Sequence, residues 1–67
     1  MEWPKSIRLQ RPGVEGAYIT FVLEDVEADR VRVTEYRWDS ARTSKSMSKK
    51  AATAEYNRLR RCGLVVS

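Results

Sequence analysis

The sequence predicts an α+β fold in which a small three-stranded antiparallel meander carries one C-terminal helix packed on one face, in the order β-β-β-α. Two observations support this prediction. Three apolar, β-branched runs separated by polar turns occupy the first half of the chain. An amphipathic segment rich in helix formers follows near the C-terminus. Because 67 residues suffice for one domain only, residues 1–67 are expected to form a single small α+β domain.

Each of the three runs has the pattern of a strand. Residues 6–10 alternate apolar and polar side chains, which is typical of a half-buried strand. Residues 17–23 are β-branched and aromatic on both faces, as in a central strand. Residues 30–38 begin with Val31 and Val33 on one face and arginines on the other. The short connections favour antiparallel pairing of neighbouring strands.

The segment after the third strand leads into the helix. Residues 39–48 are rich in hydroxyl and charged side chains and predict a loop, with a short extension of the sheet around residues 43–47 left open. Ser48 stands where a helix N-cap is expected, because its hydroxyl can accept a free amide of the first turn. The helix is predicted from about Lys49 to Arg61.

Gly63 is expected to end the helix, after which residues 64–66 pack back on the sheet or add a short extra C-terminal strand. A helical wheel places four side chains together on the apolar side of the helix: Ala52, Tyr56, Leu59 and Cys62. This side is expected to cover the sheet face formed by Ile7, Leu9, Ile19, Phe21, Leu23, Val31 and Val33. Cys62 is then expected to be a small buried thiol, and Trp3 a lid over one sheet edge.

Charge divides the chain into two halves. Residues 1–39 carry six basic and eight acidic side chains, whereas residues 40–67 carry seven basic side chains and one acid, Glu55. Glu55 is expected at the rim of the helix, paired with an arginine such as Arg58. A basic segment on a near-neutral body is typical of a module that binds a polyanion. The basic residues of the second half are expected to gather on one exposed surface.

The composition argues against catalysis, and we expect neither an enzyme nor a cofactor nor a metal site. The chain has no histidine, one cysteine and no glycine-rich phosphate loop. The acidic group formed by Glu24, Asp25, Glu27 and Asp29 is interpreted as a solvated hairpin tip. The single cysteine and the lack of a long apolar stretch predict a cytoplasmic protein without a membrane partner.

The first candidate site is the loop and the helix start. Arg42, Lys45, Lys49 and Lys50 lie among serines and threonines, and phosphate contacts are typically made by basic side chains, hydroxyls and helix-start amides together. Arg58 and Arg61 on the outer helix face would extend this basic track.

The second candidate site is the sheet face away from the helix. Tyr18 and Arg32 are expected on this face, with Arg8 nearby, and Tyr36 and Trp38 share it if no bulge intervenes. Arginines interleaved with aromatic rings bind phosphates and stack bases. The alternative is that Tyr36 and Trp38 turn inward past a bulge to complete the core, or form a dimer contact.

The order of three strands and one packing helix resembles that of plant AP2-type DNA-binding domains and of phage-integrase arm-binding domains, families that read DNA with the sheet. The stretch from Arg30 to Gly63, with a tryptophan ending a strand before an Ala-rich helix, is distantly similar to WGR modules. The signature tripeptide of WGR modules is absent, because Trp38 is followed by Asp39 and Ser40. These are similarities of topology, and no site residue is carried over from them.

The sequence therefore predicts a small non-enzymatic basic binding module with nucleic acid as its expected partner, bound in a salt-sensitive and largely sequence-independent way. The alternative is an accessory or regulatory interaction subunit that docks an acidic protein partner or associates with itself as a homodimer. Binding to an anionic membrane surface is less favoured, because the sheet needs the apolar side of the helix.

Overall fold

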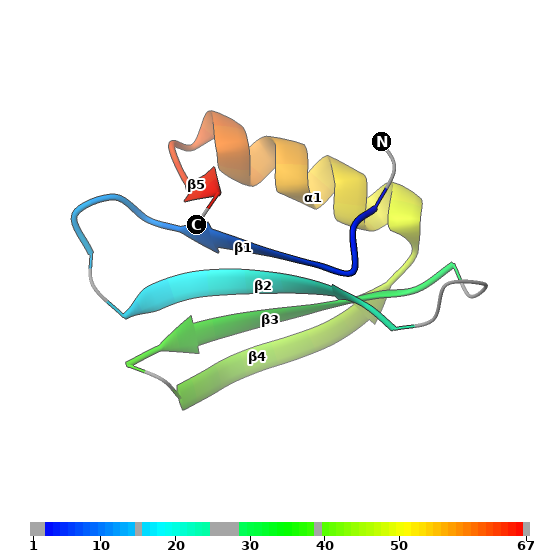
Figure 1. Cartoon of the computed structure of the whole chain (residues 1–67), viewed down its shortest axis with the longest axis horizontal. Coiled ribbons are helices and arrows are strands. Elements are labelled where there is room, and N and C mark those ends of the chain that lie inside the picture. The colour runs from blue at the N-terminus through cyan, green and yellow to red at the C-terminus, as the bar shows by residue number, and fades with distance from the viewer. Residues whose placement is uncertain (1–2, 15, 25–28, 39, 67) are drawn as a thin grey trace.

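The computed structural model describes residues 3–14, 16–24, 29–38 and 40–66. They form two layers, a five-stranded antiparallel sheet and one helix that covers one of its faces (Figure 1). In chain order the elements are β1 (Ser6–Gln10), β2 (Ala17–Leu23), β3 (Val31–Arg37), β4 (Ser40–Met47), α1 (Lys49–Arg61) and β5 (Val65–Val66). The strands lie side by side in the order β4-β3-β2-β1-β5.

The α+β class, the antiparallel meander and the C-terminal helix are confirmed, but the number of strands is higher than predicted. Residues 39–48 were predicted as a loop, with a sheet extension around residues 43–47 left open. Residues 40–47 of this segment form strand β4, which pairs with β3 along its length. This strand is exposed at all positions except Met47, so it has no alternation of apolar and polar side chains. Edge strands need little burial, and hydropathy therefore does not reveal them. The extra C-terminal strand is confirmed as β5, which pairs with β1.

The ends of α1 follow the sequence prediction. The Ser48 hydroxyl accepts the backbone amide of Ala51 at 3.2 Å, which satisfies one of the free amides of the first turn. At the other end Gly63 has φ +99°, a left-handed conformation that costs a glycine little. The amide of Leu64 then donates to the Leu59 carbonyl at 3.2 Å, and the chain turns back toward the sheet.

The core lies between α1 and the sheet face that was predicted to meet it. Its buried side chains come from three strands, the helix and the residue before β5: Leu9, Phe21, Val31, Ala52, Leu59 and Leu64. Trp3 packs against this core from the chain before β1, with its ring 5.6 Å from Phe21 and 6.2 Å from Tyr56, centroid to centroid. Its indole Nε1–H donates to the Thr53 hydroxyl at 3.0 Å. Trp3 therefore joins the two layers instead of capping an edge.

The prediction of a buried Cys62 is wrong, because its side chain is exposed. Cys62 is the C-cap of α1, just past its last full turn. The turn at Gly63 brings Leu64, which is only 3% exposed, into the core at this end of the helix. Within the described part of the chain, no helix is long and apolar enough to cross a bilayer.

Candidate nucleic-acid interface

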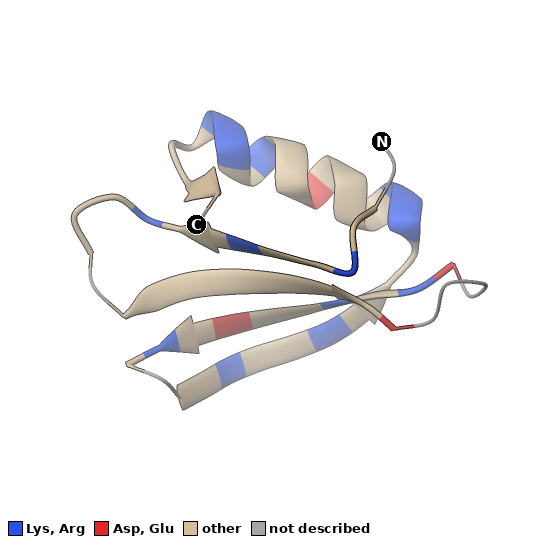
Figure 2. Cartoon of the chain, in the orientation of Figure 1, with Lys and Arg blue, Asp and Glu red and all other residues tan. Residues whose placement is uncertain are grey.

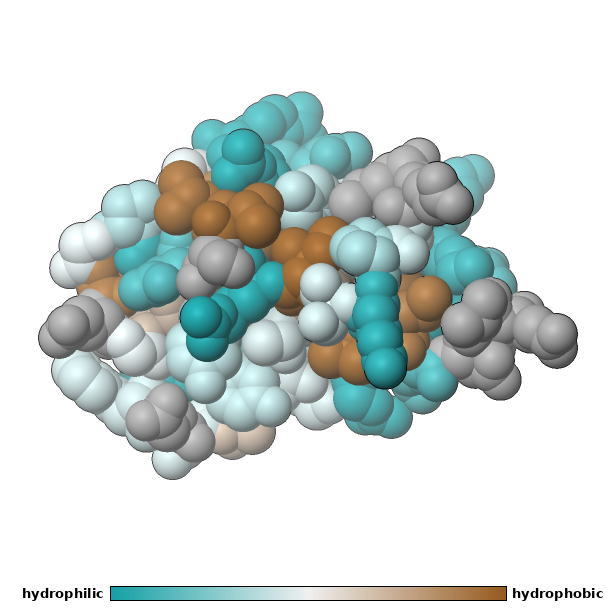
Figure 3. All heavy atoms as spheres, viewed as in Figure 1, coloured by the Kyte–Doolittle hydropathy of each residue, from teal (hydrophilic) through white to brown (hydrophobic). Residues whose placement is uncertain are grey.

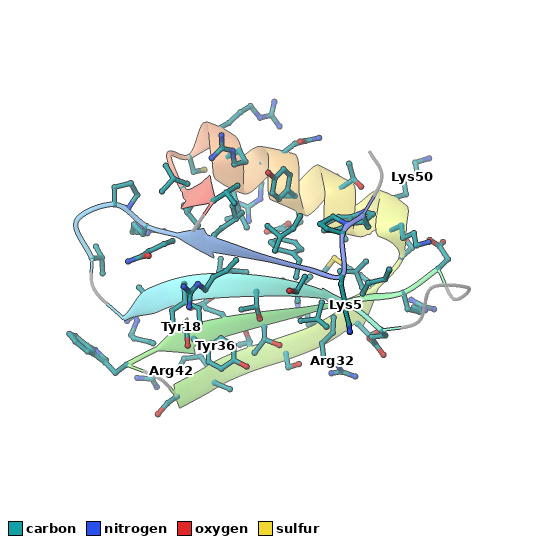
Figure 4. All side chains as sticks on the ribbon, in the orientation of Figure 1. Lys5, Tyr18, Arg32, Tyr36, Arg42 and Lys50 are labelled. Atoms are coloured by element: carbon teal, nitrogen blue, oxygen red, sulfur yellow. The ribbon has the colours of Figure 1, made fainter. Side chains whose placement is uncertain are left out.

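The sheet face that points away from α1 carries three cross-strand rows of side chains, and we call these residues the outer face. The pairing registers define the rows as Ser6–Val22–Arg32–Ser46, Arg8–Thr20–Thr34–Ser44 and Gln10–Tyr18–Tyr36–Ala41. Figure 4 shows Tyr18, Tyr36 and Arg32 on this side, and Lys50 on the helix layer. In Figure 3 the surface over β2 to β4 is mostly pale, as tyrosine, threonine and serine are, whereas strongly apolar residues gather between the strands and α1.

An aromatic stack occupies the third row. The rings of Tyr18 and Tyr36 are parallel within 16°, with centroids 4.9 Å apart. The guanidinium carbon of Arg8 lies 5.3 Å from the centroid of Tyr18, which is within the range of a cation–π contact. Tyr36 therefore packs on Tyr18 and does not turn inward to complete the core.

A network of hydroxyls lies beside this stack. Thr34 is at the centre of the face and only 8% exposed, and its hydroxyl lies 3.3 Å from that of Ser44. Arg32 donates from Nη1 to the Ser44 hydroxyl at 3.0 Å, and its Nε lies 3.7 Å from a carboxylate oxygen of Glu24. Ser44 thus holds the Arg32 guanidinium above the sheet.

Positive charge dominates the outer face. None of the residues of the three rows is acidic, and Glu24, which contacts Arg32, lies just after β2. Arg42 adds a cation at its edge, where the register shifts between Glu35 and Tyr36 and leaves Arg42 as the extra residue of a β-bulge. Figure 4 shows Lys5, just before β1, also pointing away from α1.

Trp38 does not continue the outer face. It is 71% exposed in the turn after β3 and has φ +55°, the left-handed region that a bulky side chain rarely adopts. Its backbone amide donates to the Gly16 carbonyl at 2.8 Å, which holds the turn against the β1–β2 connection. The alternation of side chains between the two sheet faces therefore ends with β3 at Arg37. Trp38 lines a hollow with Val14 and Ala17 at the end of the sheet.

The helix start is less open to an anion than expected. The backbone amide of Lys49 donates to a carboxylate oxygen of Asp29 at 3.0 Å, and the Ser48 hydroxyl accepts a hydrogen bond from the amide of Ala51. Two of the free amides of the first turn thus already have acceptors. Lys50 is exposed, and Figure 4 shows it apart from the outer face.

The remaining predicted residues lie on other surfaces. Lys45 pairs with Val33 and so belongs to the helix-facing side of β4, where it shares a groove with Arg11, Arg58, Glu35 and Glu55. Arg58 forms a salt bridge with Glu55, as predicted, and this hydrogen bond raises the pKa of Arg58 above its ordinary value. A groove with both signs of charge does not favour a polyanion.

Arg61 is exposed in the last turn of α1, about 16 Å along the helix axis from Lys50. The expected single basic surface is therefore not formed. Of the predicted site residues, the structure brings Arg32, Tyr36 and Arg42 to the outer face. It leaves Trp38, Lys45, Lys49, Lys50, Arg58 and Arg61 elsewhere, and Figure 2 shows the basic residues spread over both layers.

The described residues contain no group of three or more His, Cys, Asp or Glu side chains that could hold a metal ion. Two acids of the predicted hairpin tip have separate contacts, Glu24 with Arg32 and Asp29 with the helix start. The other two, Asp25 and Glu27, lie outside the described residues.

Comparison of the chain with protein-family models, with curated proteins and with solved structures finds no significant match. The topological resemblance to DNA-binding domains therefore adds no argument, and the case for a function depends on the residues of the outer face. Tyr18 was predicted on this face and Arg8 near it, but neither was predicted as a nucleic-acid-binding residue. Strand alternation was the signal that could have included them.

Proposed function

We propose that the protein is a non-enzymatic nucleic-acid-binding module and that the outer face is its binding surface. The observation that carries the proposal is the stack of Tyr18 and Tyr36 on a face whose charged row residues are all arginines. Arginines neutralise phosphates, while aromatic rings stack with bases or sugars.

Arg32 and Arg42 are the proposed phosphate contacts. Arg32 is held by Ser44 through Nη1, and its ion pair with Glu24 is long and half-exposed, so a phosphate can replace the carboxylate at little cost. Arg42 is exposed at the bulge beside Tyr36. The hydroxyls of Ser44 and Ser46 offer further donors along β4.

The proposal includes no catalytic step. A chain without histidine lacks the side chain that most often moves protons near neutral pH. The free thiol of Cys62 is exposed at the end of α1, on the opposite layer from the outer face.

The test compares two double variants that lower the net charge equally. Arg32→Gln with Arg42→Gln removes cations from the outer face, and Lys50→Gln with Arg61→Gln removes them from α1. Fluorescence anisotropy with a labelled oligonucleotide is measured at several salt concentrations. The outer-face variant should bind at least tenfold more weakly and should flatten the slope of log K against log salt by about 0.7–0.9 for each lost phosphate contact.

The helix variant should bind almost as the unmodified protein does. If both double variants lose the same affinity, binding follows net charge alone and the outer face is not the site. If the unmodified protein binds no oligonucleotide at low salt, the proposed function is wrong.

A second candidate function is docking of an acidic protein segment along β4. The observation that favours it is that β4 is an eight-residue edge strand, exposed at seven positions, and carries Arg42 and Lys45. An added strand would pair with its free edge and place acids against these cations. Sedimentation of the nuclease-treated protein with an acidic strand-forming peptide tests this, and no complex at low salt would exclude it.

A further inference from the structure

The aromatic stack on the outer face is incomplete on one side. The sheet order places Arg8 on the β1 side of Tyr18 and Tyr36 on its β3 side, so both faces of the Tyr18 ring are covered. Tyr36 has Tyr18 on its β2 side. On its other side, toward β4, the residue paired with it is Ala41.

Ala41 offers only a methyl group at the position where the stack would continue. It is exposed, and the side chains before and after it in the chain belong to Ser40 and to the bulge residue Arg42. Neighbouring strands lie about 4.8 Å apart, which is close to the 4.9 Å between the two tyrosine rings. A planar group above Ala41 would therefore lie at stacking distance from Tyr36.

We infer that this position receives one unpaired nucleobase, so that the substrate class is single-stranded nucleic acid. This inference depends on the proposed function. The occupant is planar because Tyr36 offers a ring face, and it is attached to an anionic backbone because Arg42 lies beside it. A base inside a duplex is covered on both faces and paired at its edge, so it cannot reach a ring that stands on a sheet.

The first experiment compares oligonucleotides of one length. The unmodified protein is titrated with a single strand, with its duplex, and with an abasic single strand that keeps the phosphates but lacks the bases, in DNA and RNA forms. The base-bearing single strand should bind about tenfold to a hundredfold more tightly than the abasic strand, as base–aromatic stacking predicts. It should also bind more tightly than the duplex.

The second experiment fills the open position. Ala41→Ile covers the position beside Tyr36 with a branched aliphatic side chain that offers no ring face, and it should lower the affinity for the base-bearing strand to that of the abasic strand. Ala41→Ser leaves the position open and is the matched control. Tyr36→Phe should keep the affinity and Tyr36→Leu should lose it. Circular dichroism confirms folding of each variant. If the leucine variant unfolds, the variant that covers position 41 still tests the site.

The outcomes separate this inference from the proposed function. Equal affinity for base-bearing and abasic strands, or an unchanged affinity of the Ala41→Ile variant, overturns the nucleobase site while the phosphate-binding face stands. Tighter binding of the duplex also overturns it. Absence of binding to every oligonucleotide at low salt overturns both proposals. Equal affinity of the protein for the DNA and RNA forms of the single strand supports a site that reads the base and not the sugar.

Discussion

The two faces of the sheet come from the same strands but differ in nearly every physical property. Phe21 and Val22 are neighbours in sequence; Phe21 is fully buried against the helix layer, whereas Val22 is 41% exposed on the outer face. The helix-facing side is apolar at its centre and is closed by α1 and Trp3. The outer face carries tyrosines, hydroxyls and arginines. Strand alternation thus lets a 67-residue chain build a core and a binding surface from one sheet.

The largest expected effect is the loss of core packing on the helix-facing side. Phe21→Ala should lower the free energy of unfolding by about 3–5 kcal/mol. A domain of this size has only roughly 3–10 kcal/mol in total, so this variant should be largely unfolded. Val22→Ala, the next residue, should lower it by less than about 1 kcal/mol. Urea denaturation measures both, and similar losses would show that the two faces are not distinct.

A smaller effect on stability is expected for Gly16, in the β1–β2 connection, which contacts Trp38 of the β3–β4 turn. Gly16 has φ +76°, and an added Cβ would lie 3.2 Å from a ring carbon of Trp38. Gly16→Ala should therefore cost about 1–2 kcal/mol for the left-handed backbone and more for this contact, and it should shift the Trp38 indole signal in NMR spectra. Gly13→Ala is the control, because Gly13 has φ +78° but no atom within 4 Å of an added Cβ. Equal losses in both variants would mean that Gly16 does not position Trp38.

Trp3→Phe tests the polar link between the layers. The phenyl ring keeps most of the contact with Phe21 and Tyr56 but loses the indole hydrogen bond to Thr53, which should cost about 1 kcal/mol. Thr53 retains its hydrogen bond to the Lys49 carbonyl. Trp38→Phe should change the unfolding free energy by less than about 0.5 kcal/mol, because Trp38 is mostly exposed. A larger loss for Trp38→Phe than for Trp3→Phe would contradict this assignment.

Glu24→Gln should have a small effect on stability and should strengthen binding. Loss of the exposed ion pair with Arg32 should cost no more than about 1 kcal/mol of folding free energy. The same change removes the competing carboxylate, so affinity for an oligonucleotide should rise about two- to fivefold. Calorimetry and anisotropy give the two values. Weaker binding of the Glu24→Gln variant would mean that Glu24 orients Arg32 for the ligand.

Much of the fold could be predicted because its elements bury one side. The alternation in β1 and β3, the continuous apolar run of β2 and the apolar stripe of α1 predicted the layer arrangement. Ser48 and Gly63 predicted the limits of the helix. Strand β4 was predicted as a loop, with only a short sheet extension around residues 43–47 left open, because it buries almost nothing. Cys62 was misplaced because a turn at Gly63 supplies Leu64 instead. These features depend on tertiary packing and leave no periodic signal.

The candidate site was predictable only in part. Alternation placed Arg32 and Tyr36 on one face, but the bulge at Arg42 and the left-handed Trp38 depend on the geometry of a turn that the pattern does not encode. The positive charge of the second half of the chain did not predict where the candidate binding surface lies. Arg42 and Lys45 both belong to β4, but Arg42 lies at the outer face, whereas Lys45 lies on the helix-facing side in a groove with Arg58 of α1.

The most direct test of the binding surface is an NMR titration of the isotopically labelled protein with a short single-stranded oligonucleotide at two salt concentrations. The amide signals of Tyr18, Thr34, Tyr36 and Ser44 should move, and the shifts should shrink as salt is added. The signals of α1 should stay in place. Shifts confined to α1, or no shifts at the lower salt concentration, would contradict the assignment of the outer face as the binding surface.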